Sequence, residues 1–375
     1  VLKRGGIAVF ADVVSPGEPL LDTWLQTIEV LRDTSHVRDY SVAEWTRMLT
    51  EAGFTLQELA PRRLPLEFQS WVTRMRTPDT LAEDLNNLAC GEGSVASGNA
   101  STSIGGRAGA SGSQATAIGS RARASGTLSV ALGERAAASG LQGVAIGGQS
   151  NASGDYSLAI SNLAQATGAA AIAIGNNSNA SGEKSVAIGA GAGAGGAFGG
   201  TLSNARTTAL GYRALAGAGA DGQTDATAIG YVARANALAA TALGSQADAN
   251  GIESVAIGAS AVANGTRSTV NGQDSRAESE NGTAIGQGSY VGPLRLLSGD
   301  TAINGTAIGQ GSRAYGDNST ATGQASLAGG QQSSVYGQGA QTGFLKLDGF
   351  DRYVNARNTA IGAAAQGGGT AEGTT

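Results

Sequence analysis

A short pattern of alternating apolar and small residues recurs through most of the chain. It is clearest as Ser-Val-Ala-Ile-Gly at 185–189 and again at 254–258. Alternation with a period of two is typical of a short strand with one apolar face. A second alternation follows each strand, as in Arg-Ala-Arg-Ala at 121–124, where Ala and Arg are expected to point in opposite directions. The pattern therefore predicts two short strands in each repeat.

The repeat has a period of 14 residues. We take as an anchor the residue that usually precedes the recurring Gly. Of the 17 intervals between successive anchors, 13 are 14 residues long, which chance does not produce. Internal repeats of this kind decide the fold. The anchors are Cys90, Ile104, Ile118, Leu132, Ile146, Ile160, Ile174, Ile188, Leu210, Ile229, Leu243, Ile257, Asn271, Ile285, Ile308, Thr322, Tyr336 and Ile361.

Two strands and two turns in 14 residues predict a narrow parallel β-solenoid. A closing Gly, as at Gly126 and Gly140, is expected to supply the positive φ that a tight corner needs. So small a coil is expected to be filled by Ala and one Ile or Val, with Cys90 as a small buried anchor of the first coil. A thin rod has little core per residue, so we expect several rods to pack together through their Ala face.

Composition changes abruptly near Leu88. All three Trp, both Met and the only His precede it, whereas 56 of the 60 Gly follow it. The apolar run at 7–14 predicts a buried strand, and apolar residues between Leu21 and Leu31 follow helical spacing. A second helix is expected to start at Ser41, which forms a capping box with Glu44, and to end at Gly53. Residues 54–59 alternate as a strand does, so this part reads as α/β.

Residues 1–77 resemble the C-terminal half of a class I S-adenosylmethionine-dependent methyltransferase. The matching text is Leu-Lys-Arg-Gly-Gly at 2–6 before the strand, Ser-Val-Ala-Glu-Trp at 41–45 and Glu-Ala-Gly-Phe at 51–54. In that family a Gly-rich loop and an acidic residue on the next strand hold the cofactor, and both would precede Val1. We therefore expect residues 1–85 to be an incomplete, Rossmann-like α/β segment that does not transfer methyl groups alone.

Residues 86–375 are similar to the head repeats of trimeric autotransporter adhesins of the YadA type. The resemblance lies in Ser-Val-Ala-Ile-Gly, the small residues after it and the closing Gly. It implies a left-handed parallel β-roll of three identical chains on a Gram-negative outer membrane, where it serves virulence by binding collagen, other matrix proteins or host cells. The sequence shows neither a heptad stalk nor a C-terminal set of membrane strands, and Lys184 and Glu253 replace the Asn that often opens the family motif.

Four intervals between anchors are longer than 14 residues, at 22, 19, 23 and 25. The extra residues are expected to leave the coil as loops, where solenoids often carry specificity. Three readings remain open for them: they pack on a neighbouring chain or cap the rod, contact a host ligand, or are tolerated insertions. Candidate partner-binding residues in the two most unusual loops are Pro293, Leu294, Arg295, Leu296, Phe344, Leu345, Phe350, Arg352 and Tyr353.

The composition argues against several other functions. A single Cys excludes a disulfide framework and a Cys-based zinc site, and the absence of His after residue 36 excludes a Ser-His-Asp triad in the repeats. The net charge of −5 without a basic stripe argues against nucleic acid, and no apolar run is long enough for a membrane helix. We assign no catalytic, cofactor-binding or metal-binding residue. The function that we expect is adhesion. The alternatives are a structural fibre or spacer segment without its own ligand, and a methyltransferase remnant fused to a repeat array.

Overall fold

The computed structural model describes residues 14, 23, 25–26, 39–59, 87–197, 200–293, 302–347, 350–353 and 356–368. Helix α2 spans Val42–Glu51 and starts as expected. The amide of Glu44 donates to Ser41 Oγ at 3.2 Å, and the amide of Ser41 donates to the Glu44 carboxylate at 2.9 Å, which confirms the capping box. Gly53 follows the helix with a φ of +88°. The expected strand at 7–14 and most of the helix at 21–31 lie outside the described residues.

Residues 54–59 do not form the strand that alternation predicts. They have no regular secondary structure, and the amide of Phe54 donates to the carbonyl oxygen of Leu49 in the preceding helix. Alternation describes which side chains share a face, but a strand also needs a neighbouring backbone to pair with.

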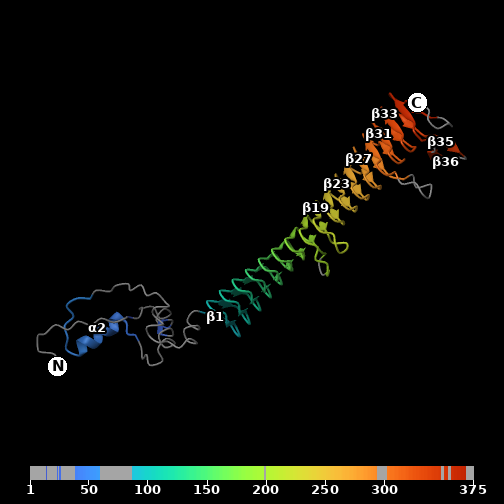
Figure 1. Cartoon of the computed structure of the whole chain (residues 1–375). Coiled ribbons are helices and arrows are strands. Elements are labelled where there is room, and N and C mark those ends of the chain that lie inside the picture. Colours follow the sequence, from blue (N-terminus) through green and yellow to red (C-terminus); the bar gives the residue numbers. More distant parts are fainter. Residues whose placement is uncertain are drawn as a thin grey trace.

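From residue 87 the chain winds into a rod of stacked coils, each contributing one strand to each of two parallel sheets (Figure 1). The first sheet contains 18 three-residue strands among the described residues. They are β1 (Leu88–Cys90), β3 (Thr102–Ile104), β5 (Thr116–Ile118), β7 (Val130–Leu132), β9 (Val144–Ile146), β11 (Leu158–Ile160), β13 (Ile172–Ile174), β15 (Val186–Ile188), β17 (Thr208–Leu210), β19 (Thr227–Ile229), β21 (Thr241–Leu243), β23 (Val255–Ile257), β25 (Thr269–Asn271), β27 (Thr283–Ile285), β29 (Thr306–Ile308), β31 (Thr320–Thr322), β33 (Ser334–Tyr336) and β37 (Thr359–Ile361).

The second sheet is built from two-residue strands, one for each coil. They are β2 (Val95–Ala96), β4 (Gly109–Ala110), β6 (Arg123–Ala124), β8 (Ala137–Ala138), β10 (Asn151–Ala152), β12 (Gln165–Ala166), β14 (Asn179–Ala180), β16 (Gly193–Ala194), β18 (Leu215–Ala216), β20 (Arg234–Ala235), β22 (Asp248–Ala249), β24 (Val262–Ala263), β26 (Arg276–Ala277), β28 (Tyr290–Val291), β30 (Arg313–Ala314), β32 (Leu327–Ala328), β34 (Gln341–Thr342) and β38 (Gln366–Gly367). A separate hairpin joins β35 (Phe344–Leu347) to β36 (Phe350–Tyr353).

The register of the first sheet confirms the repeat read from the sequence. Each strand pairs with the equivalent strand of the next coil, so that Cys90 lies opposite Ile104 and Ile104 lies opposite Ile118. All 18 anchors are the last residue of a three-residue strand. The chain is thus mainly β, a parallel solenoid of 18 turns with very little helix.

The inside of the coil is filled mainly by Ala and Ser, and this corrects one expectation. In β15, Ala187 is completely buried, whereas Val186 and Ile188 on either side of it are only partly buried. The same inward Ala and outward aliphatic pattern recurs along the sheet. The largest fully buried side chains in the described residues are Val270, Val291 and Val335. Among the described residues, no Ile is fully buried and Val is buried at only these three positions, so the expectation of one Ile or Val inside each coil is wrong.

The closing glycines also act differently from the expectation. Gly126 does not have a positive φ; a Cβ placed on it would lie 2.0 Å from the carbonyl oxygen of Gly140 in the next coil. Close stacking, rather than left-handed backbone, excludes a side chain there. Positive φ occurs instead at Gly119 and, in the same coil, at the non-glycine residues Arg121 and Leu128.

Side-chain ladders join the later coils. The amide of Gln310 donates to Gln287 at 3.1 Å, and Gln324 donates to Gln310 at 3.0 Å. Asn236 and Asn250 form a similar bond at 2.8 Å. Stacked Gln and Asn amides of this kind reinforce a parallel in-register array.

All four long intervals leave the coil at the same corner, the turn that follows a strand of the second sheet. They lie between β16 and β17, β18 and β19, β28 and β29, and β34 and β37. The described parts of these insertions, including β35 and β36, project from one side of the rod (Figure 1). The expectation that the extra residues leave the coil is confirmed for these parts.

We predict that Gly126→Ala destabilises the rod by about 1–3 kcal/mol, because the new methyl group forces adjacent coils apart. Gly106→Ala is the matched control, since a Cβ there meets nothing within 4 Å. Thermal unfolding followed by circular dichroism would compare the two variants. Equal midpoints would show that close stacking at Gly126 does not limit the coil.

Candidate functional site

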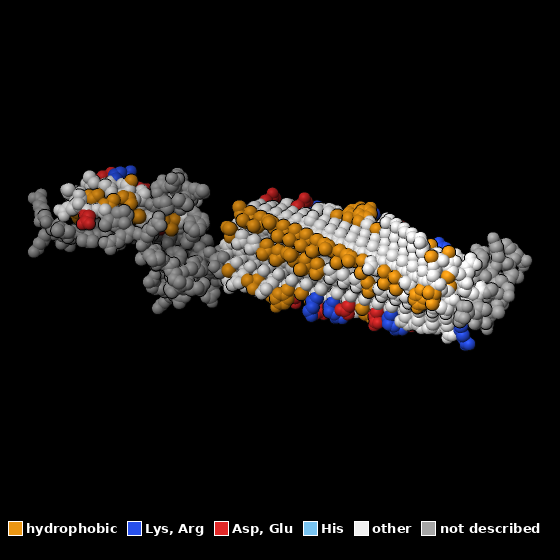
Figure 2. Space-filling model, turned by 90° about the horizontal axis from the view of Figure 1, so that it is seen from above, with side chains coloured by type: hydrophobic (Ala, Val, Ile, Leu, Met, Phe, Trp, Pro, Cys, Tyr) orange, Lys and Arg blue, Asp and Glu red, His pale blue; other side chains and the backbone are white. Residues whose placement is uncertain are grey.

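The outward face of the first sheet carries aliphatic side chains along most of its length, with Thr at many first positions. We call it the aliphatic face; it consists of the first and third residue of each three-residue strand. Figure 2 shows a band of hydrophobic side chains along one face of the rod, broader toward the end near β1. Leu132, Leu210 and Leu243 on this face are each more than 40% exposed. Such a surface is larger than the scattered apolar residues that monomers normally expose.

The aliphatic face is most apolar in five consecutive coils, from β7 to β15. There both outward residues of each strand are Val, Leu or Ile, whereas most later strands place Thr first. Neighbouring coils bring these side chains into direct register, as in Leu158, Ile172 and Val186. This part of the rod is therefore the strongest candidate for an interface with another chain.

The structure changes which face is available for assembly. Ala was expected to lie between chains. The inward Ala side chains of the strands are instead buried inside the coil, where they cannot contact another chain. Cys90, expected to be buried, is exposed, because the third position of a strand points outward. The anchors Ile104, Ile118, Ile146, Ile160, Ile174, Ile188, Ile229, Ile257, Ile285, Ile308 and Ile361 occupy this same outward position.

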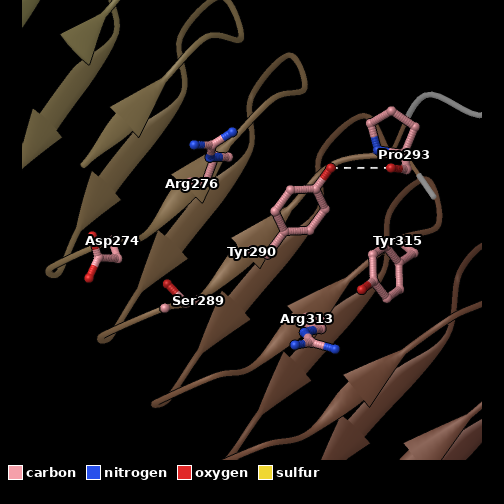
Figure 3. A pocket seen from close by; sticks show the side chains of 8 residues that line it. Asp274, Arg276, Ser289, Tyr290, Pro293, Arg313 and Tyr315 are labelled. Carbon is pink, nitrogen blue, oxygen red and sulfur yellow. Dashed lines mark hydrogen bonds between the residues drawn. The ribbon is translucent and has the colours of Figure 1, made fainter. Parts of the chain in front are cut away.

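A second surface feature is an open groove on the second sheet, which we call the Arg–Tyr groove. It encloses about 570 Å³ and crosses β26, β28 and β30 (Figure 3). Its principal lining residues are Asp274, Arg276, Tyr290, Pro293, Arg313 and Tyr315.

Tyr290 lies at the centre of the groove. Its register partners are Arg276 in the preceding coil and Arg313 in the next one. The ring centroids of Tyr290 and Tyr315 are 5.7 Å apart and tilted by 49°. The Tyr290 hydroxyl donates to the carbonyl oxygen of Pro293 at 3.2 Å, which holds the ring across the corner where the insertion begins.

The two arginines of the groove differ in their surroundings. Arg276 forms an exposed ion pair with Glu278, with Nη1 and Oε1 3.5 Å apart. Arg313 is exposed and has no carboxylate within ion-pair distance in the part of the chain that the structure describes. Burial raises the pKa of the Tyr315 hydroxyl, and nearby Arg313 opposes this rise, so Tyr315 is neutral at physiological pH.

The candidate loop residues are only partly placed. Pro293 lines the Arg–Tyr groove, whereas Leu294, Arg295 and Leu296 lie outside the described residues. In the hairpin, Phe344 pairs with Tyr353, Leu345 with Arg352, and Phe350 with Leu347. The two loops therefore belong to separate coils and are not brought together into one site by strand pairing.

The sequence analysis did not predict the aromatic and basic residues of the groove as candidate site residues. Tyr290 is five residues after its anchor, and so are Arg276 and Arg313. Alignment of all coils at this offset would have singled out Tyr290 as the only aromatic residue at that position. The 23-residue interval between Ile285 and Ile308 hides the match between Tyr290 and Arg313.

The described residues contain neither a metal-binding cluster nor a membrane-spanning helix. No group of three or more His, Cys, Asp or Glu in them is arranged to hold a metal ion. Within the same ranges, no helix is both long and apolar enough to cross a membrane.

Stacked coils, an Ala interior and an exposed aliphatic face define a repeat β-solenoid of the kind found in adhesin heads. The YadA head domain repeat family matches residues 96–160, 166–192, 223–247, 249–289 and 301–326. The solenoid from 96 to 326 therefore belongs to the YadA head repeat family.

The N-terminal region has different relatives. The chain is 53% identical over 83 residues to the uncharacterized protein YafE of Escherichia coli, covering 22% of this chain and 40% of that protein. It is 36% identical over 78 residues to the uncharacterized methyltransferase YcgJ of Bacillus subtilis, covering 21% of this chain and 31% of that protein. The chain thus spans less than half of the length of either relative.

Proposed function

We propose that residues 86–375 form the head of a homotrimeric adhesin, exposed at a bacterial outer membrane, that attaches to collagen, other host matrix proteins or host cells. The observation that carries this proposal is the aliphatic face. Residues 1–85 are, in this proposal, a separate methyltransferase-like segment. Membership of the solenoid in the YadA head repeat family supports the adhesive role.

The aliphatic face supports assembly on physical grounds. A coil filled mainly by Ala and Ser buries little apolar surface, so its own core stabilises it weakly. The large side chains, such as Ile160 and Ile174, remain partly exposed in the single chain. Burial against identical chains removes this surface from water at about 25 cal/mol per Å². A closed ring of three chains leaves no copy of the face exposed.

Assembly through the aliphatic face leaves the second sheet and the insertion corner facing solvent. Outward residues of the second sheet are mostly polar or small, as at Asn151, Gln165 and Arg234. Host contacts are therefore expected on this outer sheet and on the insertions beside it. Solenoids commonly present binding residues on one such face.

Methyl transfer is a second candidate, favoured by the similarity to YcgJ, whose name describes a methyltransferase. Titration of the full chain with S-adenosylmethionine in a calorimeter separates it from adhesion. No saturable heat is expected, because the sequence contains no Gly-rich cofactor loop in a βαβ setting. Saturable binding would instead favour an enzymatic role for this segment.

We predict that Ile160→Lys combined with Ile174→Lys lowers the mass in solution from three chains to one. Each substitution places charge on a face that assembly would desolvate, and the two positions are adjacent in register. Light scattering coupled to size exclusion measures the mass. The control is Asn151→Lys with Gln165→Lys, adjacent positions on the second sheet that are expected to leave the trimer intact. A wild-type chain that runs as a monomer would contradict the assembly.

A cysteine variant tests the same face without weakening the fold. Cys90→Ser with Ile174→Cys places one thiol at the centre of the aliphatic face, where chains in the trimer approach each other. Mild oxidation is expected to give disulfide-linked chains on a non-reducing gel. Cys90→Ser with Gln165→Cys is the control and is expected to remain unlinked, because that position faces outward.

We predict that deletion of residues 344–353 reduces binding to immobilised collagen or to host cells. The hairpin holds the densest group of aromatic residues in the repeat region and projects from the rod. Exposed aromatic and Arg residues are frequent interface anchors. Binding is measured on trimers of unchanged mass, so that loss of assembly is excluded. Full binding by the deleted trimer would show that this hairpin does not contact the partner.

A further inference from the structure

The Arg–Tyr groove is unlike any other place on the second sheet. In the described coils, Tyr290 is the only aromatic residue at its outward strand position, and Tyr315 is the only one at the corner position two residues later. Gly292 makes room for this arrangement: a Cβ there would lie 2.6 Å from the Tyr290 hydroxyl oxygen. The groove therefore depends on a local departure from the repeat.

The groove combines aromatic surface with separated polar groups. Successive strands lie about 4.8 Å apart, so Arg276 and Arg313 bracket the Tyr290 ring at a separation of roughly 10 Å. Asp274 lies toward the Arg276 side of the groove, away from Tyr315 (Figure 3). The side near Arg313 thus offers a cation without a carboxylate partner, whereas the other side offers both donors and acceptors.

These features favour a sugar over a peptide or nucleic acid. Peptides commonly bind to unpaired strand edges, but β28 is paired on both sides, with β26 and β30. Nucleic acid needs an extended basic surface. The groove has only two arginines, and the chain as a whole has a net charge of −5. A sugar ring presents an apolar C–H face to an aromatic ring and hydroxyl groups to charged side chains. Arg is suited to bind an acidic substituent in a bidentate manner.

We propose that the Arg–Tyr groove binds an acidic glycan. Its carboxylate or sulfate pairs with Arg313, and a sugar ring packs against Tyr290. Hydroxyl groups of the adjoining sugar reach Arg276 and Asp274. The Arg276–Glu278 ion pair does not prevent this, because exposed ion pairs are worth only about 0–1 kcal/mol.

This inference rests on the proposed adhesive function and adds to it a class of ligand. Assembly through the aliphatic face leaves the groove open in every chain. A trimer therefore presents three copies, which increases the apparent affinity for a surface that carries many glycans. Weak binding at one groove is then sufficient for attachment.

The test uses the full chain and three soluble probes measured by saturation-transfer NMR and calorimetry: sialyllactose, a chondroitin sulfate oligosaccharide and neutral lactose. Binding of either acidic probe without binding of lactose is expected, and the preferred probe identifies the carboxylate or the sulfate as the recognised group. Arg313→Gln is expected to weaken this binding roughly ten- to hundredfold, as for loss of a charged hydrogen bond.

Further variants separate the ring from its hydroxyl group and from general charge effects. Tyr290→Ala is expected to weaken binding about two- to tenfold, whereas Tyr290→Phe retains most of it. Arg234→Gln is the matched control, since Arg234 has the same coil position on β20 without aromatic neighbours. Wild-type protein that binds neither acidic probe, or binds lactose equally, would overturn the proposal, as would full binding by Arg313→Gln.

Failure of the glycan proposal remains distinguishable from failure of the adhesin proposal. The same samples are measured for mass in solution and for binding to immobilised collagen. A trimer that binds collagen but no acidic glycan would retain the adhesive function and reject the ligand assigned to the groove.

Discussion

The close stacking of one coil on the next is the constraint on which the rest of the structure depends. At Gly126 the neighbouring backbone is so near that a single methyl group would collide with the carbonyl of Gly140. Inside the coil, the inward positions are mostly completely buried Ala and Ser. The larger aliphatic residues of the first sheet point outward instead. The side chains that would form the core of an ordinary domain thus lie on the surface of the single chain. In the proposed trimer, contacts between chains would remove this surface from water, while the coil supplies the backbone hydrogen bonds.

Interactions between coils are repeated, so the rod tolerates local exceptions. Ser161 replaces the usual Gly after Ile160 and still takes a positive φ of 106°, at a cost that the well-formed neighbouring coils can absorb. Residues such as Arg121 and Leu128 are likewise held at positive φ by turns that recur in each coil. The Gln and Asn ladders of the later coils add polar contacts where the aliphatic face contains more Thr. All four long insertions follow a strand of the second sheet. The first-sheet strands on either side of each insertion still pair in the regular register, so the rod varies at this corner without a change in stacking.

The period of the rod could be read from the sequence, but the direction of its side chains could not. A 14-residue repeat with Gly at fixed positions determines the coil and the register, and all 18 anchors were placed correctly. Alternation shows that Val186 and Ile188 share a face and that Ala187 faces the other way. It does not show which face is inside, and the usual association of hydrophobic residues with the interior gave the wrong answer. Side-chain volume would have given the right one, since 14 residues enclose too little space for Ile. The Arg–Tyr groove was missed for a different reason: it joins residues from coils separated by an irregular interval, so its members line up only when every coil is aligned on its own anchor. The hairpin and Pro293 were recognisable because their composition departs from the repeat.

Different constraints on the two sheets explain where binding chemistry can arise. Outward residues of the first sheet are almost all Val, Leu, Ile or Thr, which suits the interface proposed for this face. Outward residues of the second sheet touch neither the coil interior nor the aliphatic face, and they range from Gly109 to Arg123, Leu215 and Tyr290. Binding specificity is therefore expected on the second sheet and on the insertion corner beside it. The groove at Tyr290 lies where an unusual outward residue meets an insertion, and Gly292 and Pro293 shape both. A rod whose interior and interface are fixed by stacking can thus acquire a ligand by changing a few residues at one corner, without any change to the scaffold.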